Sequence, residues 1–112
     1  MNIDVKKVKI TVTSPKENVD EIRQALGDAG AGIIGNYTYC STSADCIGTF
    51  RGNEKSNPYI GTKNQLEIVK EVKIEVACDL EKVKAVLQKL REVHPYEEPD
   101  INIIPLIDEN DI

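Results

Sequence analysis

The sequence predicts one α+β domain with the element order β-α-β-β-α-β. Two segments, 7–13 and 66–78, alternate apolar and polar residues as half-buried strands do. Each is followed by a segment, 18–29 or 80–93, whose apolar residues recur at helical spacing. A chain of 112 residues is long enough for one hydrophobic core and too short for two, so we expect a single domain over residues 1–112.

The first strand and helix follow from this spacing. In 7–13, alternate residues place a β-branched row on one side of a strand. Asn18 is a residue type that caps helices, and Glu21 stands three positions after it. The helix that follows is expected to end at Gly30 and to pack an apolar stripe on the sheet. That stripe consists of Val19, Ile22, Leu26 and Ala29.

The middle of the chain is less regular. Residues 33–46 have a β-prone composition and predict either one long strand or two bent pieces. Residues 48–64 are rich in Gly, Asn and Pro and predict a long loop, with a short strand around 49–51 as an option. Because structureless connections of this length usually bind a ligand or contact a partner, the loop is a candidate functional segment.

The second half predicts a long strand, a helix and a short strand. In 66–78 only Val69 and Lys70 break the alternation. The residues expected to face the core are Leu66, Ile68, Val72, Ile74, Val76 and Cys78; those expected on the opposite face are Glu67, Glu71, Lys73 and Glu75. Asp79 is a good helix cap, and the helix after it must end before Pro95. Its predicted stripe is Leu80, Val83, Leu87 and Leu90.

Residues 101–106 predict the last strand, and the acidic tail 107–112 is a candidate for disorder. The complete order is that of ferredoxin-like folds, in which a four-stranded antiparallel sheet carries two helices on one face. The other face of the sheet is then either solvated or covered by a neighbouring subunit.

Composition excludes several classes of function. The net charge is -5, and the basic residues are interspersed with acidic ones, which argues against a nucleic-acid partner. We also expect no membrane partner and a cytoplasmic location, because no apolar run approaches the roughly 20 residues of a span and the N-terminal segment does not resemble a signal peptide. Three cysteines without a secretory signal favour reduced thiols.

Two motifs have a structural and a chemical interpretation. Residues 30–35 match GxGxxG, but they follow a helix and lead into a β-prone segment, so helix termination and turning explain them better than dinucleotide binding. Cys78 is expected to be a buried structural thiol. Cys40 and Cys46 do not have the spacing of a zinc knuckle, and metal binding or oxidation between them is the lesser alternative.

Residues 94–99, His-Pro-Tyr-Glu-Glu-Pro, form the densest group of functional side chains. An imidazole beside carboxylates could bind a divalent metal or exchange a proton. The alternative is a rigid connector between helix and strand, fixed by its two prolines, and on chemistry alone this alternative is preferred.

Three ordered blocks of sequence resemble a known family. They are 32–37 with 40–41, then 48–51 with 57–61, and finally 94–99 with 104–106. In these blocks the chain resembles the inserted PII- and CutA-like domain of the Nif-three-like (NGG-interacting-factor-three) proteins, whose complete members are described as dinuclear-metal hydrolase-like. The resemblance implies a ferredoxin-like fold and a stand-alone version of the insert without the domains that supply the metal ligands. By analogy it also implies a homotrimer whose inter-subunit clefts bind small ligands or metal ions.

The sequence therefore favours a non-enzymatic regulatory module that binds a small ligand or a metal as a homo-oligomer, preferably a trimer. Its partners would be a small metabolite or a protein, and no catalytic residue is assigned. The first alternative is a CutA-like protein that handles divalent metals, and the second is a hydrolase with His94 as general base. Ligand-binding candidates are His94, Tyr96, Glu97, Glu98, Asn57, Pro58, Tyr59 and Gly61; metal candidates, for a divalent ion as the cofactor, are His94, Glu97 and Glu98.

Overall fold

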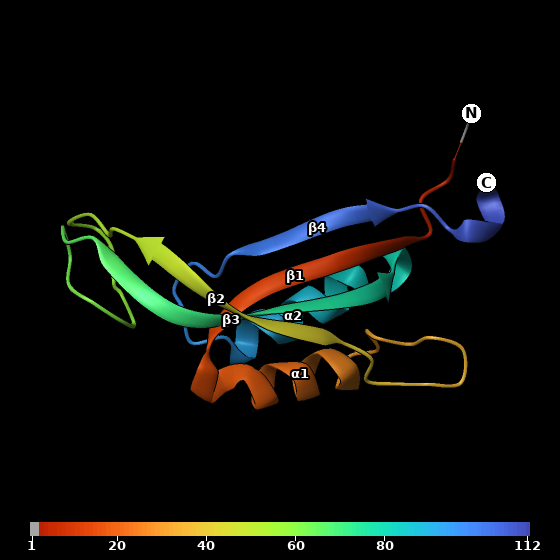
Figure 1. Cartoon of the computed structure of the whole chain (residues 1–112), viewed down its shortest axis with the longest axis horizontal. Coiled ribbons are helices and arrows are strands. Elements are labelled where there is room, and N and C mark those ends of the chain that lie inside the picture. The colour runs from red at the N-terminus through yellow and green to blue at the C-terminus, as the bar shows by residue number, and fades with distance from the viewer. Residues whose placement is uncertain (1–2) are drawn as a thin grey trace.

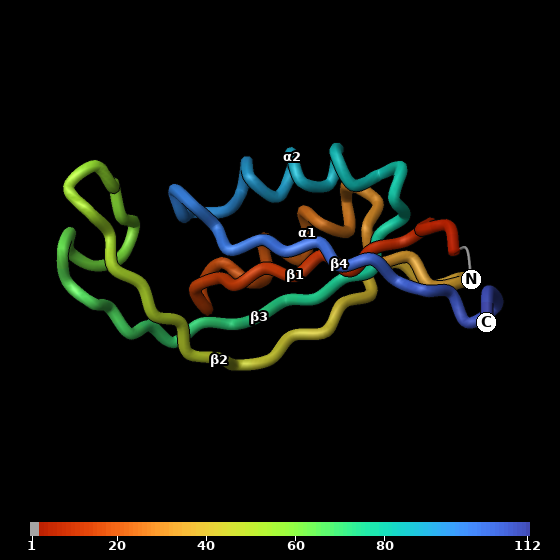
Figure 2. The backbone as a smooth tube through the Cα atoms, turned by 90° about the horizontal axis from the view of Figure 1, so that it is seen from above, coloured from red at the N-terminus to blue at the C-terminus, as the bar shows by residue number. Residues whose placement is uncertain are grey.

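A computed structural model of the chain, which describes residues 3–112, shows four strands, two α-helices and three short 3-10 turns (Figure 1). The elements are β1 (Lys7–Pro15), η1 (Lys16–Asn18), α1 (Val19–Asp28), β2 (Thr42–Phe50), β3 (Glu67–Asp79), η2 (Leu80–Lys82), α2 (Val83–Val93), β4 (Ile101–Leu106) and η3 (Glu109–Asp111). The strands form one sheet in the order β2-β3-β1-β4, and every neighbouring pair is antiparallel. Figure 2 shows both helices on the same side of this sheet. The predicted ferredoxin-like fold is confirmed.

The hydrophobic core lies between the helices and one face of the sheet. Alternate residues of β1 and β3, led by Ile10 and Ile74, are fully buried against Ile22 of α1 and Leu90 of α2. The predicted stripe of α1 is confirmed, with Ala29 packed at its margin. None of the helices in residues 3–112 has the length and apolar character needed to cross a bilayer.

Both helices begin differently from the prediction. Each is entered through a 3-10 turn, η1 or η2, and neither Asn18 nor Asp79 makes a side-chain capping bond to any of residues 3–112. In α2 the extra turn shifts the apolar stripe. Leu80 is half exposed, Leu87 is only partly buried, and Val86 takes the central position between Val83 and Leu90.

The prediction of a strand over 33–46 is wrong for its first part. Residues 29–41 form a loop, and the strand begins at Thr42. Backbone bonds join Gly32 to Ala77 and Cys40 to Gly32, while the Tyr39 hydroxyl donates to Asp28 at 2.6 Å. The structural interpretation of the glycines at 30–35 is confirmed: Gly30 follows the helix with φ +102°.

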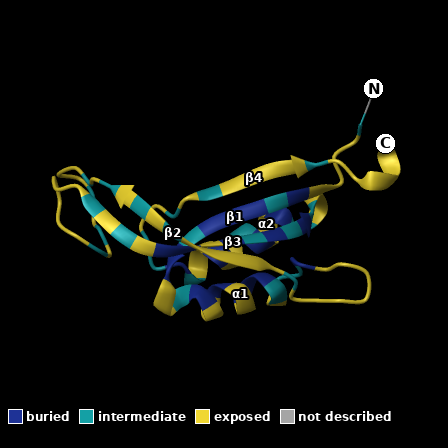
Figure 3. Ribbon diagram, viewed as in Figure 1, coloured by how far each residue is buried: buried dark blue, intermediate teal, exposed yellow. Residues whose placement is uncertain are grey.

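The long loop is shifted by a few residues relative to the prediction. Residues 49–50 belong to β2, so the connection between β2 and β3 covers residues 51–66. We call β2 from Cys46, this loop and β3 up to Glu71 the arm, because it extends past the helices at one end of the molecule (Figure 1). The expected burial of Leu66 and Ile68 is wrong: they are 66% and 70% exposed, since neither helix reaches this part of the sheet (Figure 3). The acidic tail contains η3, which Asp108 caps through the Asn110 backbone N–H.

Candidate functional site

The structure contains a cleft of about 790 Å³ between the arm, the helix-free face of the sheet and the segment 94–100 that joins α2 to β4. We call segment 94–100 the connector. Two contacts join it to the 51–66 loop of the arm. The backbone N–H of Asn57 donates to Glu97 Oε1 at 3.1 Å, and the rings of Tyr59 and Tyr96 lie with centroids 6.2 Å apart and planes inclined by 55°. Segments about forty residues apart in the sequence thus form one site.

Glu71 provides a buried carboxylate in this cleft. It lies on the helix-free face of β3 and is only 6% exposed. The Tyr96 hydroxyl donates to Glu71 Oε2 at 2.8 Å. On the neighbouring strand, a Cβ at Gly48 would lie 1.7 Å from Glu71 Oε1, so the position next to this carboxylate accepts only glycine without rearrangement. The absence of a side chain at Gly48 therefore leaves the space that the Glu71 carboxylate occupies.

Burial favours the protonated forms of the neighbouring Tyr96 phenol and Cys46 thiol. It raises the pKa of the Tyr96 phenol, and the bond to Glu71 raises it further. Cys46 is the cross-strand partner of Glu71 and also lines the cleft. Burial raises the pKa of the Cys46 thiol, and the Glu71 charge adds to the effect. Since the thiolate is the nucleophilic form of cysteine, Cys46 is a poor nucleophile near neutral pH.

His94 supports the cleft from behind and does not line it. Its Nε2 lies 2.7 Å from the Thr13 carbonyl oxygen, and its Nδ1 accepts the Tyr96 backbone N–H at 3.1 Å. These two bonds require a neutral ring with the proton on Nε2. Burial lowers the His94 pKa and so favours this neutral form. His94 thus positions Tyr96, which in turn contacts Glu71 and Tyr59.

The structure brings most of the predicted ligand-binding residues together. Those that line the cleft are Pro58, Tyr59, Tyr96, Glu97 and Glu98. Asn57 contributes a backbone N–H to the arm–connector contact. Gly61 lies outside the cleft with φ +88°, at a position where a Cβ would lie 2.4 Å from Glu67 Cγ.

Sequence reasoning missed Glu71 and the sheet residues Thr11, Thr13 and Lys73, which also line the cleft, and it considered Cys46 only for metal binding or oxidation. The alternation of apolar and polar residues in β3 correctly placed Glu71 and Lys73 on the helix-free face. It did not predict that Glu71 is buried there. The signal in the sequence was that Glu71 directly follows the break in alternation at residues 69–70.

The side chains predicted as metal ligands are largely engaged in other contacts. Both ring nitrogens of His94 are engaged, and Glu97 accepts from Asn57. Within residues 3–112 no three His, Cys, Asp or Glu side chains are grouped so that they could hold a metal ion.

Comparison with known proteins places this geometry in a family. No family model matches the sequence. The chain is 42% identical over 103 residues to a Halalkalibacterium halodurans protein named "GTP cyclohydrolase 1 type 2 homolog", and 41% identical over 98 residues to the Bacillus subtilis protein of the same name. A crystal structure of a Bacillus cereus protein related to NIF3 superposes on 93% of the chain with a TM-score of 0.82 and 38% identity. The chain is a Nif-three-like domain of the PII/CutA-like type.

The matched region covers 92% and 88% of this Nif-three-like domain in the two comparisons. The domain spans only 28% and 26% of the length of those two relatives. It likewise covers 26% of the Bacillus cereus chain. CutA1 from Shewanella sp. SIB1 resembles it over 94% of this chain and 85% of that chain, with a TM-score of 0.71 and 20% identity. CutA from Synechococcus elongatus gives a TM-score of 0.70 at 16% identity, over 95% and 81% of the two chains. These CutA similarities concern the fold.

Proposed function

We propose that this Nif-three-like domain is a non-enzymatic regulatory module that binds a small metabolite in the cleft between arm and connector. The observation that carries the proposal is the cleft itself, whose volume suits a small ligand and whose two walls meet through Tyr59, Tyr96 and Glu97. A ligand that touches both walls would order the arm against the body of the domain, which is a direct route from binding to a changed surface.

The state of the reactive groups supports a binding role over catalysis. Cys46 and Tyr96 hold their protons, and His94 uses both ring nitrogens within the fold. A general base must be free to reach the proton that it abstracts. The hydrolase alternative would require His94 to leave Thr13 and Tyr96 first.

The shape of the molecule supports action as a homo-oligomer, with a trimer as the preferred state. β2 is an edge strand, so one row of its backbone N–H and C=O groups faces outward. Beside it, the arm exposes Ile47, Leu66 and Ile68. An unpaired strand edge next to exposed apolar side chains is a surface that a second copy of the chain could cover.

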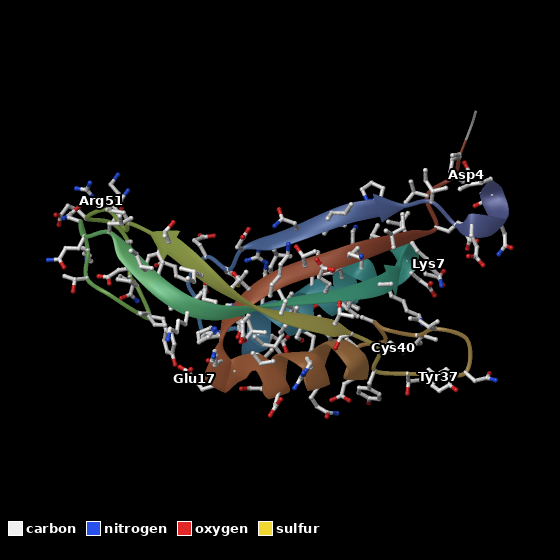
Figure 4. All side chains as sticks on the ribbon, in the orientation of Figure 1. Asp4, Lys7, Glu17, Tyr37, Cys40 and Arg51 are labelled. Atoms are coloured by element: carbon white, nitrogen blue, oxygen red, sulfur yellow. The ribbon has the colours of Figure 1, made fainter. Side chains whose placement is uncertain are left out.

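The test is a thermal-shift screen of metabolites and nucleotides, followed by calorimetric titration of any compound that raises the melting temperature. GTP belongs in the screen because the relatives are named as homologues of a GTP cyclohydrolase. We expect Tyr59→Ala to weaken binding of a positive compound about tenfold and Tyr37→Ala, at the exposed tip of the 29–41 loop (Figure 4), to leave it unchanged. A screen without any thermal shift would overturn the small-ligand proposal.

A divalent-metal role is the second candidate, favoured by the carboxylates Glu97, Glu98 and Asp100 along one side of the cleft. Because residues 3–112 of one chain supply no complete ligand group, this role requires shared ligands between subunits. Elemental analysis of purified protein tests it, together with cation titration of Glu98→Gln. Protein that carries no metal and whose cation affinity is unchanged by the substitution would exclude it.

A further inference from the structure

Glu71 is a buried carboxylate that the rest of the chain compensates only in part. Its one side-chain hydrogen bond within residues 3–112 is the neutral donor Tyr96. Lys73 lies on the same face of β3 but pairs with Glu75 at 3.7 Å, and no cation of the described chain forms an ion pair with Glu71. A carboxylate offers about four acceptor positions, so Glu71 can accept further hydrogen bonds besides the one from Tyr96.

The charges around Glu71 also favour a positively charged ligand. The acidic residues that line the cleft are Glu71, Glu97, Glu98 and Asp100, and the basic ones are Arg51, Lys55 and Lys73. Arg51 lies at the far end of the arm (Figure 4). Lys73 is occupied by Glu75. The connector therefore contributes only acidic charges to the cleft, whereas the basic residues come from the arm and from β3.

The walls of the same region are aromatic. Phe50, Tyr59 and Tyr96 line the cleft, and the rings of Tyr59 and Tyr96 are tilted toward one another. Aromatic faces attract flat cations, and a carboxylate matches a planar pair of N–H donors with two parallel hydrogen bonds.

We infer that the cleft selects planar cationic ligands of the amidinium or guanidinium class, whose paired N–H groups donate to Glu71 while the flat body lies against Tyr59 and Tyr96. This inference rests on the proposed ligand-binding function and names the chemistry that the site recognises. Such a ligand supplies the positive partner that Glu71 lacks, and it places its flat part where arm and connector meet.

Benzamidine is a suitable probe because it combines an amidinium group with a flat ring. We would titrate it into isotope-labelled protein and follow the backbone amides of Gly48, Glu71 and Tyr96 by NMR. Benzoate, of the same size and opposite charge, is the matched ligand control. We expect benzamidine to shift these amides at concentrations at least tenfold below any effect of benzoate.

Two variants locate the contact. Glu71→Gln keeps an acceptor for Tyr96 and removes the charge, so benzamidine affinity is expected to fall at least tenfold. Glu21→Gln, at an exposed position of α1 outside the cleft lining, is the matched control and is expected to change the affinity less than twofold. If Glu71→Gln does not fold, the comparison of benzamidine with benzoate on the unaltered protein still decides the question.

The outcomes separate this inference from the proposed function. Benzoate that binds as well as benzamidine, or benzamidine affinity that is equal in Glu71→Gln, would overturn the inference. If the metabolite screen still yields a cleft ligand of another class, the binding function survives that result. If neither benzamidine nor any screened compound binds, both are rejected.

Discussion

His94 was the most conspicuous chemical residue of the sequence, and its structural role is that of a positioning group. One ring nitrogen holds β1 through the Thr13 carbonyl, and the other holds the connector through the Tyr96 backbone N–H. The imidazolium form has a proton on both nitrogens and cannot accept the Tyr96 N–H. Protonation of His94 is therefore coupled to the position of Tyr96 and to the cleft.

This coupling gives a pH dependence of stability with a definite sign. Burial lowers the His94 pKa below its ordinary 6.5 in the folded protein. The unfolded chain then binds the proton more readily, so the His94 contribution to folding is complete above pH 6.5 and is lost as the pH falls through the folded-state pKa. We expect urea unfolding between pH 7.5 and 5 to show this loss.

The control for this pH effect is His94→Gln, whose side chain does not titrate. Its unfolding free energy is expected to vary less with pH over the same interval, with the remaining variation due to carboxylates. Equal pH dependence in the two proteins would show that His94 is not the titrating group.

Gly48 is the second residue whose role depends on a single close approach. In Gly48→Ala the new Cβ would overlap Glu71 Oε1, so Glu71 and Tyr96 must move. We expect the unfolding free energy to fall by about 1–3 kcal/mol, the usual range for overpacking. The same substitution made in a Glu71→Ala background has no carboxylate to displace and is expected to cost at least about 1 kcal/mol less. Equal costs in both backgrounds would contradict the proposed contact.

At the scale of elements, the periodicity of apolar residues predicted most of the helices and strands. The two helices, β1 and β4 lie where the sequence predicted them, apart from the 3-10 turns that begin the helices, because apolar spacing decides which face a segment buries. The start of β2 was predicted too early. Residues 33–41 have a strand-like composition, but the Tyr39–Asp28 bond and the Gly32 backbone bonds hold them as a loop. These are specific hydrogen bonds, of which Gly32 to Ala77 joins distant segments, and composition does not encode them.

The candidate site was predictable in the same partial way. The prolines and aromatic residues of the connector and of residues 57–61 marked two segments that the structure brings together at the cleft. That these segments bind a ligand stays a prediction. Glu71 was predicted to lie on the polar face of its strand and was not predicted to belong to a site. Its burial depends on Tyr96 from the connector and on the absence of a side chain at Gly48 in the next strand, and neither is visible from the sequence around Glu71.

β3 offers a direct test of where the core ends, because it carries two isoleucines on the same face. Ile74 is fully buried under the helices, whereas Ile68 lies on the arm and is 70% exposed. Ile74→Ala is expected to lower the unfolding free energy by about 2–5 kcal/mol, the range for large core truncations. Ile68→Ala is expected to stay within about 0.5 kcal/mol under conditions where the protein is monomeric. Chemical denaturation of both variants measures the contrast, and equal losses would mean that the core extends into the arm.

The whole molecule is elongated, with extents of 48 × 31 × 24 Å, because the arm continues the sheet beyond its two helices. This architecture leaves the apolar face of the arm without a cover from the described part of the same chain. A compact domain of this size would ordinarily bury such residues. Assembly would therefore bury more apolar surface on the arm than elsewhere on the molecule.

Native mass spectrometry tests the assembly proposed from this shape. We expect a homotrimer for the unaltered protein and a shift to monomer for Ile68→Lys, because burying a lysine charge in an apolar contact is unfavourable. Ile34→Lys is the matched control: Ile34 is also well exposed, at 59%, but lies in the 29–41 loop away from the arm. The control is expected to remain trimeric, and both variants are expected to keep the melting behaviour of a folded domain. A trimer that survives Ile68→Lys would place the subunit contact elsewhere, and a monomeric unaltered protein would confine ligand binding to the cleft within one chain.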